Sequence, residues 1–448
     1  MKIGVIGSGV AGLVSALTLQ EKFEVSLFEK NSKLGGHSNT VTIEQENNKY
    51  SVETGFIVLN DKNYPIFTSL LKHLNIGVNN SSMSFSVSVD KGQFEYSSSY
   101  IGLLGQTKNI IDPKYWGMLR DINYFYTNAV RDVKDCPDNE TLGQFLKRFN
   151  YSNKFIDYHL VPMTASIWSC PTKSILNFPI KSLLVFFENH KLLNIYNRPK
   201  WSTVNKGSRE YVKKIQSLLK GEIYTNTKVK KISKSKEGIR VHYEEGIKTF
   251  DKVILACHAD QSSEILIENF SEEANLLKDF KYQKNTSILH SDINFMPKRK
   301  SVWSSWNYIT ETGNSGNLSI TYWMNELQGI NSPKPILLSL NPKILPNPDL
   351  IYGQYSYSHP ILDNNAINIQ KKLSSTQGKN NLWFCETIRA TNPCGEQPLA
   401  PNASCLLGSM ILPPYVKNAF DNKSSFDFLN FKKDIRIASR QLDNVVEV

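Results

Sequence analysis

The sequence is poor in cysteine and in long apolar runs. Six cysteines are scattered over 448 residues, and their spacing fits neither a metal site nor a disulfide framework. No apolar stretch approaches the roughly 20 residues that span a bilayer. The first residues begin a strand rather than a signal peptide. These absences exclude disulfide-rich secreted and membrane-spanning classes, and predict a soluble cytoplasmic protein of two or three domains.

Acidic residues are also scarce. The chain has 41 aspartates and glutamates against 52 lysines and arginines, which gives a net charge of +11. Part of the excess lies in residues 228–236, which read KVKKISKSK. This run could form a face for nucleic acid or anionic membrane, or a lysine-rich, solvated strand edge. The second reading is favoured because no nucleic-acid-binding module accompanies it. We expect no nucleic-acid partner, and peripheral membrane contact stays open.

What is present is a strand–turn–helix–strand order at the start of the chain. An apolar run, Ile3–Ile6, precedes Gly7-Ser8-Gly9-Val10-Ala11-Gly12, a helical pattern and a second strand-like run, Glu24–Phe28. In this order Gly7 permits a tight turn, Gly9 lets the backbone approach a diphosphate, and Gly12 lets helix and strand pack closely. The helix N-terminus then offers N–H groups to the phosphates.

An acid follows the second strand at the spacing that a ribose requires. Glu29 lies 22 residues after Gly7, where its carboxylate can accept hydrogen bonds from a ribose 2′-hydroxyl and would repel a 2′-phosphate. The ligand is therefore FAD or NAD rather than NADP. A purely structural glycine-rich turn is the alternative, and the flanking strand, helix and acid together argue against it.

The next residues indicate FAD. Gly35-Gly36-His37 resembles the second glycine motif of the flavin amine oxidase superfamily, with an ordinary Gly-Gly loop as the alternative. In that superfamily a loop placed like Thr54-Gly55-Phe56 meets the isoalloxazine ring, although Gly55 could equally mark a strand bulge. The resemblance also implies that the backbone of Val229 brackets the adenine.

The resemblance extends from Met1 to about Cys385. It is to a branch of predicted NAD/FAD-binding proteins often associated with fatty-acid-modifying methyltransferases, and it implies an FAD-dependent oxidoreductase with a small-molecule substrate, for which it suggests a lipid acyl chain. Beyond the motifs above, the matching runs include Ile167-Trp168-Ser169, Phe187-Glu188-Asn189-His190, Gly207-Ser208-Arg209-Glu210-Tyr211, Ala256-Cys257-His258-Ala259-Asp260-Gln261 and Tyr322-Trp323-Met324-Asn325.

The implied fold class is α/β. We expect a discontinuous Rossmann-type FAD-binding domain made of residues 1–75 and 200–262, which the chain rejoins near 380–385. We expect an α+β substrate domain made of residues 76–199 and 263–379. No second GxGxxG motif indicates a separate NAD(P)H domain. The oligomeric state is not predicted.

After Cys385 the chain changes character. Residues 386–409 read ETIRATNPCGEQPLAPNASCLLGS, which resembles the active-site segment of ribonucleotide reductase of the cobalamin-dependent class. Asn392, Cys394 and Glu396 match that family's radical-site core, and Cys405 matches its reducing cysteine. The 63 residues from 386 to 448 cannot build the barrel that aims this motif. We therefore expect an inactive, stranded fragment that packs poorly, with a seam within a few residues of Cys385.

No catalytic residue is assigned in the flavoprotein part. His37, His190 and His258 are candidate acid–base groups, and each is more often a structural hydrogen-bonding residue. Three functional classes remain open: an FAD-dependent oxidoreductase, a non-catalytic FAD-binding partner of a lipid enzyme, and a reductase fragment. The residues predicted to bind FAD are Gly7, Gly9, Val10, Ala11, Gly12, Glu29, Lys30, Gly35, Gly36, His37, Thr54, Gly55, Phe56 and Val229.

Overall fold

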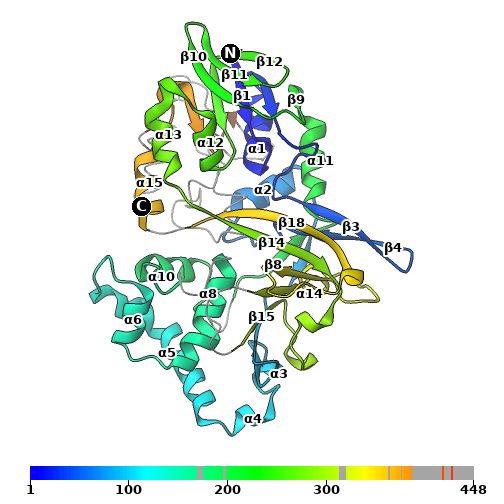
Figure 1. Ribbon diagram of the computed structural model, residues 1–448, viewed down its shortest axis with the longest axis vertical. Helices are drawn as coiled ribbons and strands as arrows, with labels where there is room; N and C mark the ends of the chain where they lie inside the picture. Colours follow the sequence, from blue (N-terminus) through cyan, green and yellow to red (C-terminus); the bar gives the residue numbers. More distant parts are fainter. Residues whose placement is uncertain are drawn as a thin grey trace.

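The computed structural model describes residues 1–168, 175–194, 198–311, 319–361, 364–374 and 376–385. It also describes two short paired strands, β20 (Val416–Lys417) and β21 (Ser425–Phe426). A parallel sheet with its helices forms one end of the molecule, and a larger sheet with a group of helices forms the other (Figure 1). The reductase-like residues Asn392, Cys394, Glu396 and Cys405, and the predicted poor packing of the tail, lie outside the described residues.

The first sheet has five parallel strands in the order β19-β13-β1-β2-β9. Its central strands are short apolar runs that are buried on both faces, as parallel sheets require. Helix α1 (Val10–Leu19) follows β1 and packs against β2 and α11 (Arg209–Leu218). The strands are β1 (Lys2–Ile6), β2 (Glu24–Phe28), β9 (Glu222–Tyr224), β13 (Lys252–Leu255) and β19 (Leu382–Phe384).

A three-stranded antiparallel sheet adjoins this one. It consists of β10 (Lys231–Ser235), β11 (Gly238–Tyr243) and β12 (Gly246–Phe250). The apolar run from Phe250 to Ala256 predicted one strand, which is wrong. The chain turns at Asp251, whose carboxylate accepts the Lys2 N–H and whose own N–H donates to the Lys2 carbonyl. Apolar periodicity does not reveal such a turn, because the buried Phe250 at the end of β12 is followed after two residues by the buried apolar run of β13.

The second sheet has seven strands in the order β18-β14-β17-β16-β15-β6-β7. All its pairs are antiparallel except β15 with β6, so the sheet joins two distant stretches of chain. Its strands are β6 (Phe85–Val89), β7 (Phe94–Ser97), β14 (Tyr282–His290), β15 (Trp306–Thr310), β16 (Ile320–Trp323), β17 (Leu337–Leu340) and β18 (Ile351–Pro360). Two antiparallel pairs complete the described sheets: the hairpin of β3 (Thr40–Gln45) with β4 (Asn48–Glu53), and β5 (Val78–Ser81) with the distant β8 (Trp201–Val204).

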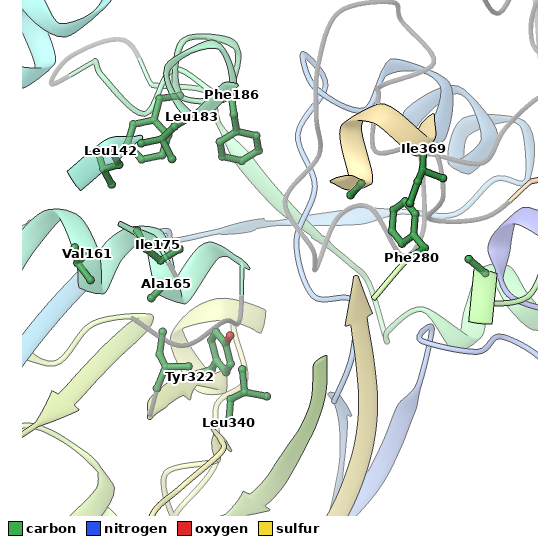
Figure 2. Close-up of a cluster of buried hydrophobic side chains, with 14 of the residues drawn as sticks. Leu142, Val161, Ala165, Ile175, Leu183, Phe186, Phe280, Tyr322, Leu340 and Ile369 are labelled. Atoms are coloured by element: carbon green, nitrogen blue, oxygen red, sulfur yellow. The ribbon is translucent and has the colours of Figure 1, made fainter. Parts of the chain in front are cut away.

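Helices cover one side of the second sheet and pack apolar side chains against it. Figure 2 shows Leu142, Ala165 and Leu183, which come from separate helices, gathered near Tyr322 and Leu340 of the sheet. The remaining helices are α2 (Pro65–His73), α3 (Tyr100–Leu103), α4 (Thr107–Ile110), α5 (Pro113–Asp132), α6 (Leu142–Arg148), α7 (Asn153–Phe155), α8 (Val161–Trp168), α10 (Ile180–Asn189), α12 (Ala259–Ile265), α13 (Ser271–Lys278), α14 (Met324–Gln328) and α15 (Asn364–Ser374). Within the described ranges, no helix combines the length and the apolar character needed to cross a bilayer.

Candidate dinucleotide site

The glycine turn between β1 and α1 is the most tightly constrained backbone of the site. Gly7 has φ +101°, and a Cβ there would lie 2.4 Å from the Ala256 carbonyl oxygen. A Cβ on Gly12 would lie 1.9 Å from the Gly7 carbonyl oxygen. These contacts are too short for any side chain, so both glycines let strand, turn and helix pack together.

Gly9 differs from its two neighbours because nothing crowds it. It is the N-cap of α1, with φ −58° and ψ 172°, and a Cβ built there would meet no atom within 4 Å. The first N–H groups of a helix, here from Val10, Ala11 and Gly12, have no acceptor inside the helix. Open space above Gly9 and these donors together suit a diphosphate.

Glu29 lies directly beside this turn. Its Oε2 accepts the Ser8 N–H at 3.1 Å and the Ser8 hydroxyl at 2.6 Å, and its Oε1 accepts the Asn31 N–H and side-chain amide at 2.8 and 2.9 Å. The side chain is buried. A carboxylate therefore faces the mouth of α1, and a ribose hydroxyl that binds it has to share it with Ser8 or Asn31.

The other residues expected near the adenine flank Glu29 in the backbone. The Thr227 N–H donates to the Glu29 carbonyl at 2.8 Å, which brings the buried Val229 into this region. Lys30 follows Glu29 with an exposed side chain. The structure thus places both residues near Glu29 along the backbone, Val229 buried and Lys30 exposed.

The Gly-Gly motif packs onto the first glycine turn. Gly35 and Gly9 form an isolated parallel bridge, with the Gly35 N–H donating to the Ser8 carbonyl at 2.9 Å. Gly36 has φ +57°, and its Cβ position lies 3.3 Å from the Gly9 Cα. A pocket of about 500 Å³ opens beside Gly36, between residues 31–40 and α11.

Thr54, Gly55 and Phe56 meet His37 at the far end of the same region. A Cβ on Gly55 would lie 2.1 Å from the His37 carbonyl oxygen, which also accepts the Phe56 N–H at 3.1 Å. Gly55 is therefore needed for close backbone contact, beyond the end of β4 at Glu53. The loop expected against the flavin ring therefore contacts the end of the second glycine motif.

Three histidines converge at this point. The His37 ring lies 5.7 Å from the His258 ring and 5.8 Å from the His359 ring, and Tyr357 lies 5.0 Å from His37 between centroids. Burial, helped by His359 and His258, holds the pKa of His37 well below its usual value. Burial likewise lowers the pKa of His359 to about 4. Both rings are therefore neutral near pH 7, and among the described residues the buried His37 Nε2 has no hydrogen-bond partner.

His37, Thr54, Gly55 and Phe56 line one cavity with Tyr357 and His359 of β18. Its volume of about 20 Å³ holds a water molecule and does not hold a three-ring isoalloxazine. The open space over Gly9, the N–H groups at the start of α1 and the Glu29 carboxylate have the chemistry that the ADP half of FAD would require. The flavin half does not fit the cavity at this size, and we assign no catalytic step to it.

Sequence reasoning missed several residues of this region. Ser8 occupies a variable position of the glycine motif, and Tyr357 and His359 lie on a strand with no motif of its own. His190, in contrast, lies at the end of α10, where it stacks on Phe186 and where its Nδ1 lies 3.0 Å from the Phe186 carbonyl. The structure therefore gives His190 contacts of a structural kind.

The Gly207–Tyr211 motif also has a structural explanation. The buried Glu53 carboxylate accepts hydrogen bonds from Thr40 and from the Ser208 N–H and hydroxyl. Burial raises the pKa of Glu53, although these hydrogen bonds oppose the shift. A Cβ on Gly207 would strike Glu53 and Thr40. These hydrogen bonds connect the start of α11 to the β3–β4 hairpin.

Two family models match the chain. The model described as flavin containing amine oxidoreductase matches residues 10–291, and the model described as ribonucleotide reductase, barrel domain, matches residues 365–448. The second match begins 20 residues before the seam predicted at Cys385. Between residue 365 and Cys385 the structure pairs β19 with β13, and the Cys385 N–H donates to the Leu255 carbonyl at 2.9 Å. The position of the seam stays a prediction.

Curated relatives match short stretches only. A vitamin B12-dependent ribonucleoside-diphosphate reductase of Thermoplasma acidophilum is 41% identical over 75 residues, which are 17% of this chain and 9% of the relative. A 4,4′-diapolycopen-4-al dehydrogenase of Metabacillus indicus is 60% identical over 37 residues, 8% of either chain. This chain thus covers less than a tenth of each relative's length.

Solved structures match the fold over nearly all of the chain. A reduced UDP-galactopyranose mutase has a TM-score of 0.64 at 12% identity and covers 99% of this chain and 98% of its own. A fatty acid isomerase from P. acnes has a TM-score of 0.59 at 12% identity, covering 90% of this chain and 96% of its own. At this identity the likeness confirms the fold class alone.

Proposed function

The chain belongs to the flavin containing amine oxidoreductase family, and from this premise we propose that it oxidises an apolar substrate, with a lipid acyl chain as the favoured class. The family implies FAD as cofactor and a flavin oxidoreductase as the type of protein. Bound FAD would supply the redox chemistry by accepting a hydride or electrons from a substrate carbon. The residues of this chain would bind FAD and the substrate, orient them toward each other and exclude water.

The dinucleotide end of the proposal depends on a short list of residues. Val10, Ala11 and Gly12 would donate to the diphosphate over Gly9, and Glu29 would accept from the ribose. The Gly35–Gly36 backbone would close the path between the diphosphate and the loop at Thr54.

The observation that supports an apolar substrate is the composition of the cavity beside His37. Phe56, Ile57, Leu338 and Leu340 supply apolar walls, and Tyr357 and His359 supply neutral polar groups. Apolar walls with a few placed polar groups are typical of sites that bind apolar ligands, and this cavity would have to widen beyond about 20 Å³ to admit one. The names of two similar proteins, a fatty acid isomerase and a diapolycopenal dehydrogenase, point to the same substrate class.

The test is anaerobic reduction of the full-length, FAD-loaded protein. We expect oleic acid to bleach the visible flavin band and putrescine, a polar amine, to leave it unchanged. His359→Gln should slow the bleaching because it alters the cavity wall. The matched variant His242→Gln, in β11 of the three-stranded sheet, should not. Bleaching by putrescine alone would refute the apolar substrate.

One observation favours a second candidate, a non-catalytic FAD-binding partner of a lipid-modifying enzyme. The cavity beside His37 has room for little more than a water molecule. If FAD binds and no apolar compound reduces it, this candidate replaces the first. Reductase chemistry is not proposed, because the tail matches only part of a barrel domain.

A further inference from the structure

The helices α3, α4 and the start of α5 carry an unusual concentration of exposed apolar side chains. Tyr100, Ile101, Leu104, Ile110, Ile111 and Trp116 form what we call the α3–α5 patch. Ile101 is 75% exposed, Ile111 83% and Trp116 50%. Exposed apolar residues are ordinary when scattered singly, whereas six within 17 residues mark an interaction surface.

The segment is folded with its polar side inward. The Gln106 side chain accepts the Glu95 N–H and donates to the carbonyls of Gly92 and Gln93, and the Asn109 side chain donates to the Glu95 carbonyl. Both amides are buried, while the neighbouring Ile110 and Ile111 face solvent. Burying amides and exposing isoleucines is the reverse of what a helix in contact with water alone requires.

Hydrogen bonds hold the exposed face in place. The Trp116 indole N–H donates to the Ile110 carbonyl at 2.8 Å, and the Tyr115 hydroxyl donates to the Leu103 carbonyl at 2.7 Å. These bonds tie α5 to the ends of α4 and α3. The apolar surface is therefore a fixed feature of the fold rather than a frayed terminus.

The charge around the patch is positive. Lys108 and Lys114 are exposed within the segment, and Lys300 is exposed just before Val302, against which Gly105 packs. Among the residues that the structure describes, none of these three lysines has an ion pair. Of the nearby carboxylates, Asp112 is paired with Lys154 at 2.6 Å and the buried Asp121 lies 3.3 Å from Arg120.

We propose that the α3–α5 patch docks the protein on the surface of an anionic lipid bilayer. Isoleucines would enter the acyl boundary, Trp116 and Tyr100 would lie at the headgroup level, and the lysines would meet anionic headgroups. Protein interfaces are depleted in lysine, so exposed lysines beside exposed isoleucines favour an anionic bilayer over a protein partner. The inference is independent of the proposed oxidoreductase activity.

The patch is distinct from the lysine-rich run at residues 228–236. That run lies at β10, at the opposite end of the molecule from α3 and α4 (Figure 1). Its lysines include partnered ones: Lys230 pairs with Glu244 at 3.3 Å, and Lys234 donates to the Asn380 side chain at 3.2 Å. It also lacks an exposed apolar cluster, since Val229 and Ile232 are buried.

The experiment is co-sedimentation of the full chain with vesicles of phosphatidylcholine, with or without phosphatidylglycerol. We expect binding to the anionic vesicles, reduced by about tenfold or more in Ile101→Ser/Ile111→Ser. Lys108→Gln/Lys114→Gln should lower binding to anionic vesicles toward the level of neutral ones. A matched control, Ile344→Ser/Leu345→Ser, alters an equally exposed apolar pair (77% and 67%) outside the patch and should bind like the parent.

Each other outcome overturns the proposal. The proposal is wrong if the parent fails to sediment with anionic vesicles, or if both serine pairs reduce sedimentation equally. Light scattering provides the remaining check: a dimer that dissociates in Ile101→Ser/Ile111→Ser, without vesicle binding by the parent, would assign the patch to a second copy of the chain. Because the altered side chains are exposed, equal unfolding midpoints by circular dichroism should confirm that every variant folds.

Discussion

Ser8 and Glu29 share a buried hydrogen bond of 2.6 Å inside the turn that would receive a dinucleotide. The bond occupies the same carboxylate that a ribose hydroxyl would use. Ser8 therefore holds Glu29 in position and also competes with the ligand for it. This double role makes the two residues separable by mutation.

We predict opposite effects of Glu29→Gln and Ser8→Ala on FAD affinity. Glu29→Gln removes the charge that strengthens hydrogen bonds to the ribose, worth about 1.5–3 kcal/mol, and should weaken FAD binding by about 10- to 100-fold. Ser8→Ala removes the competing hydroxyl, so affinity should stay equal or rise while the free energy of unfolding falls by about 1 kcal/mol. Flavin fluorescence titration measures the FAD affinity, and urea unfolding measures the free energy of unfolding. Weaker FAD binding by Ser8→Ala would show that the hydroxyl itself holds the ligand.

The glycines of the turn should respond differently to alanine. Gly9→Ala meets no atom within 4 Å and suits the φ of −58°, so the flavin-free protein should unfold at the same or slightly higher urea concentration. The new methyl group occupies the diphosphate space, so FAD affinity should fall by about tenfold or more. Gly12→Ala clashes with the Gly7 carbonyl and should lower the free energy of unfolding by about 1–3 kcal/mol or prevent folding.

Gly117→Ala is the matched control for this series. It lies in α5, its Cβ position is open, and alanine should add up to about 1 kcal/mol of stability without changing FAD affinity. Unchanged FAD affinity in Gly9→Ala would place the ligand elsewhere and contradict the whole site.

The strand–turn–helix–strand order could be predicted because all its determinants lie within Lys2–Glu29. The histidine cluster could not, since His37, His258 and His359 come from three segments, each more than 100 residues from the next. Glu53 and Ser208 illustrate the same limit. Glu53 directly precedes Thr54-Gly55-Phe56 and Ser208 lies in the Gly207–Tyr211 motif, and only the fold shows that the two residues are hydrogen-bonded. Contacts across the chain carry no local periodicity, so sequence alone could suggest the loops and not their pairing.

Gln377 should be important for the edge of the parallel sheet. Its side chain accepts the Phe384 N–H at 3.0 Å and donates to the Phe384 carbonyl at 3.1 Å, on the side of β19 that does not pair with β13. Gln377→Ala would leave both buried backbone groups without this partner. We expect the free energy of unfolding to fall by about 1–3 kcal/mol in urea titrations. Gln283→Ala, which alters a partly exposed side chain, should change it by less than about 0.5 kcal/mol, and an equal effect of the two would remove any special role from Gln377.

Acid should destabilise the fold through its buried histidines, and His159 tests this most directly. The Tyr96 hydroxyl lies 2.7 Å from its Nδ1 and the Tyr126 hydroxyl 3.0 Å from its Nε2, and burial lowers its pKa to about 3. Below pH 6.5 the unfolded chain binds a proton that the folded chain does not, so stability falls as pH decreases from about 6.5 toward 3. At about 1.36 kcal/mol per pH unit, His159 should account for at most about 2 kcal/mol of loss between pH 6.5 and 5.

His159→Gln should therefore show a smaller difference in the free energy of urea unfolding between pH 6.5 and 5 than the parent does. His73→Gln, which alters an exposed side chain in α2, should keep the parent's difference. The comparison depends on slopes rather than absolute stability, so a variant that is less stable at pH 7 still reports on the proton. Equal slopes in the parent and His159→Gln would mean that the buried imidazole takes up its proton without unfolding, and that the Tyr96–His159–Tyr126 contacts tolerate a charge.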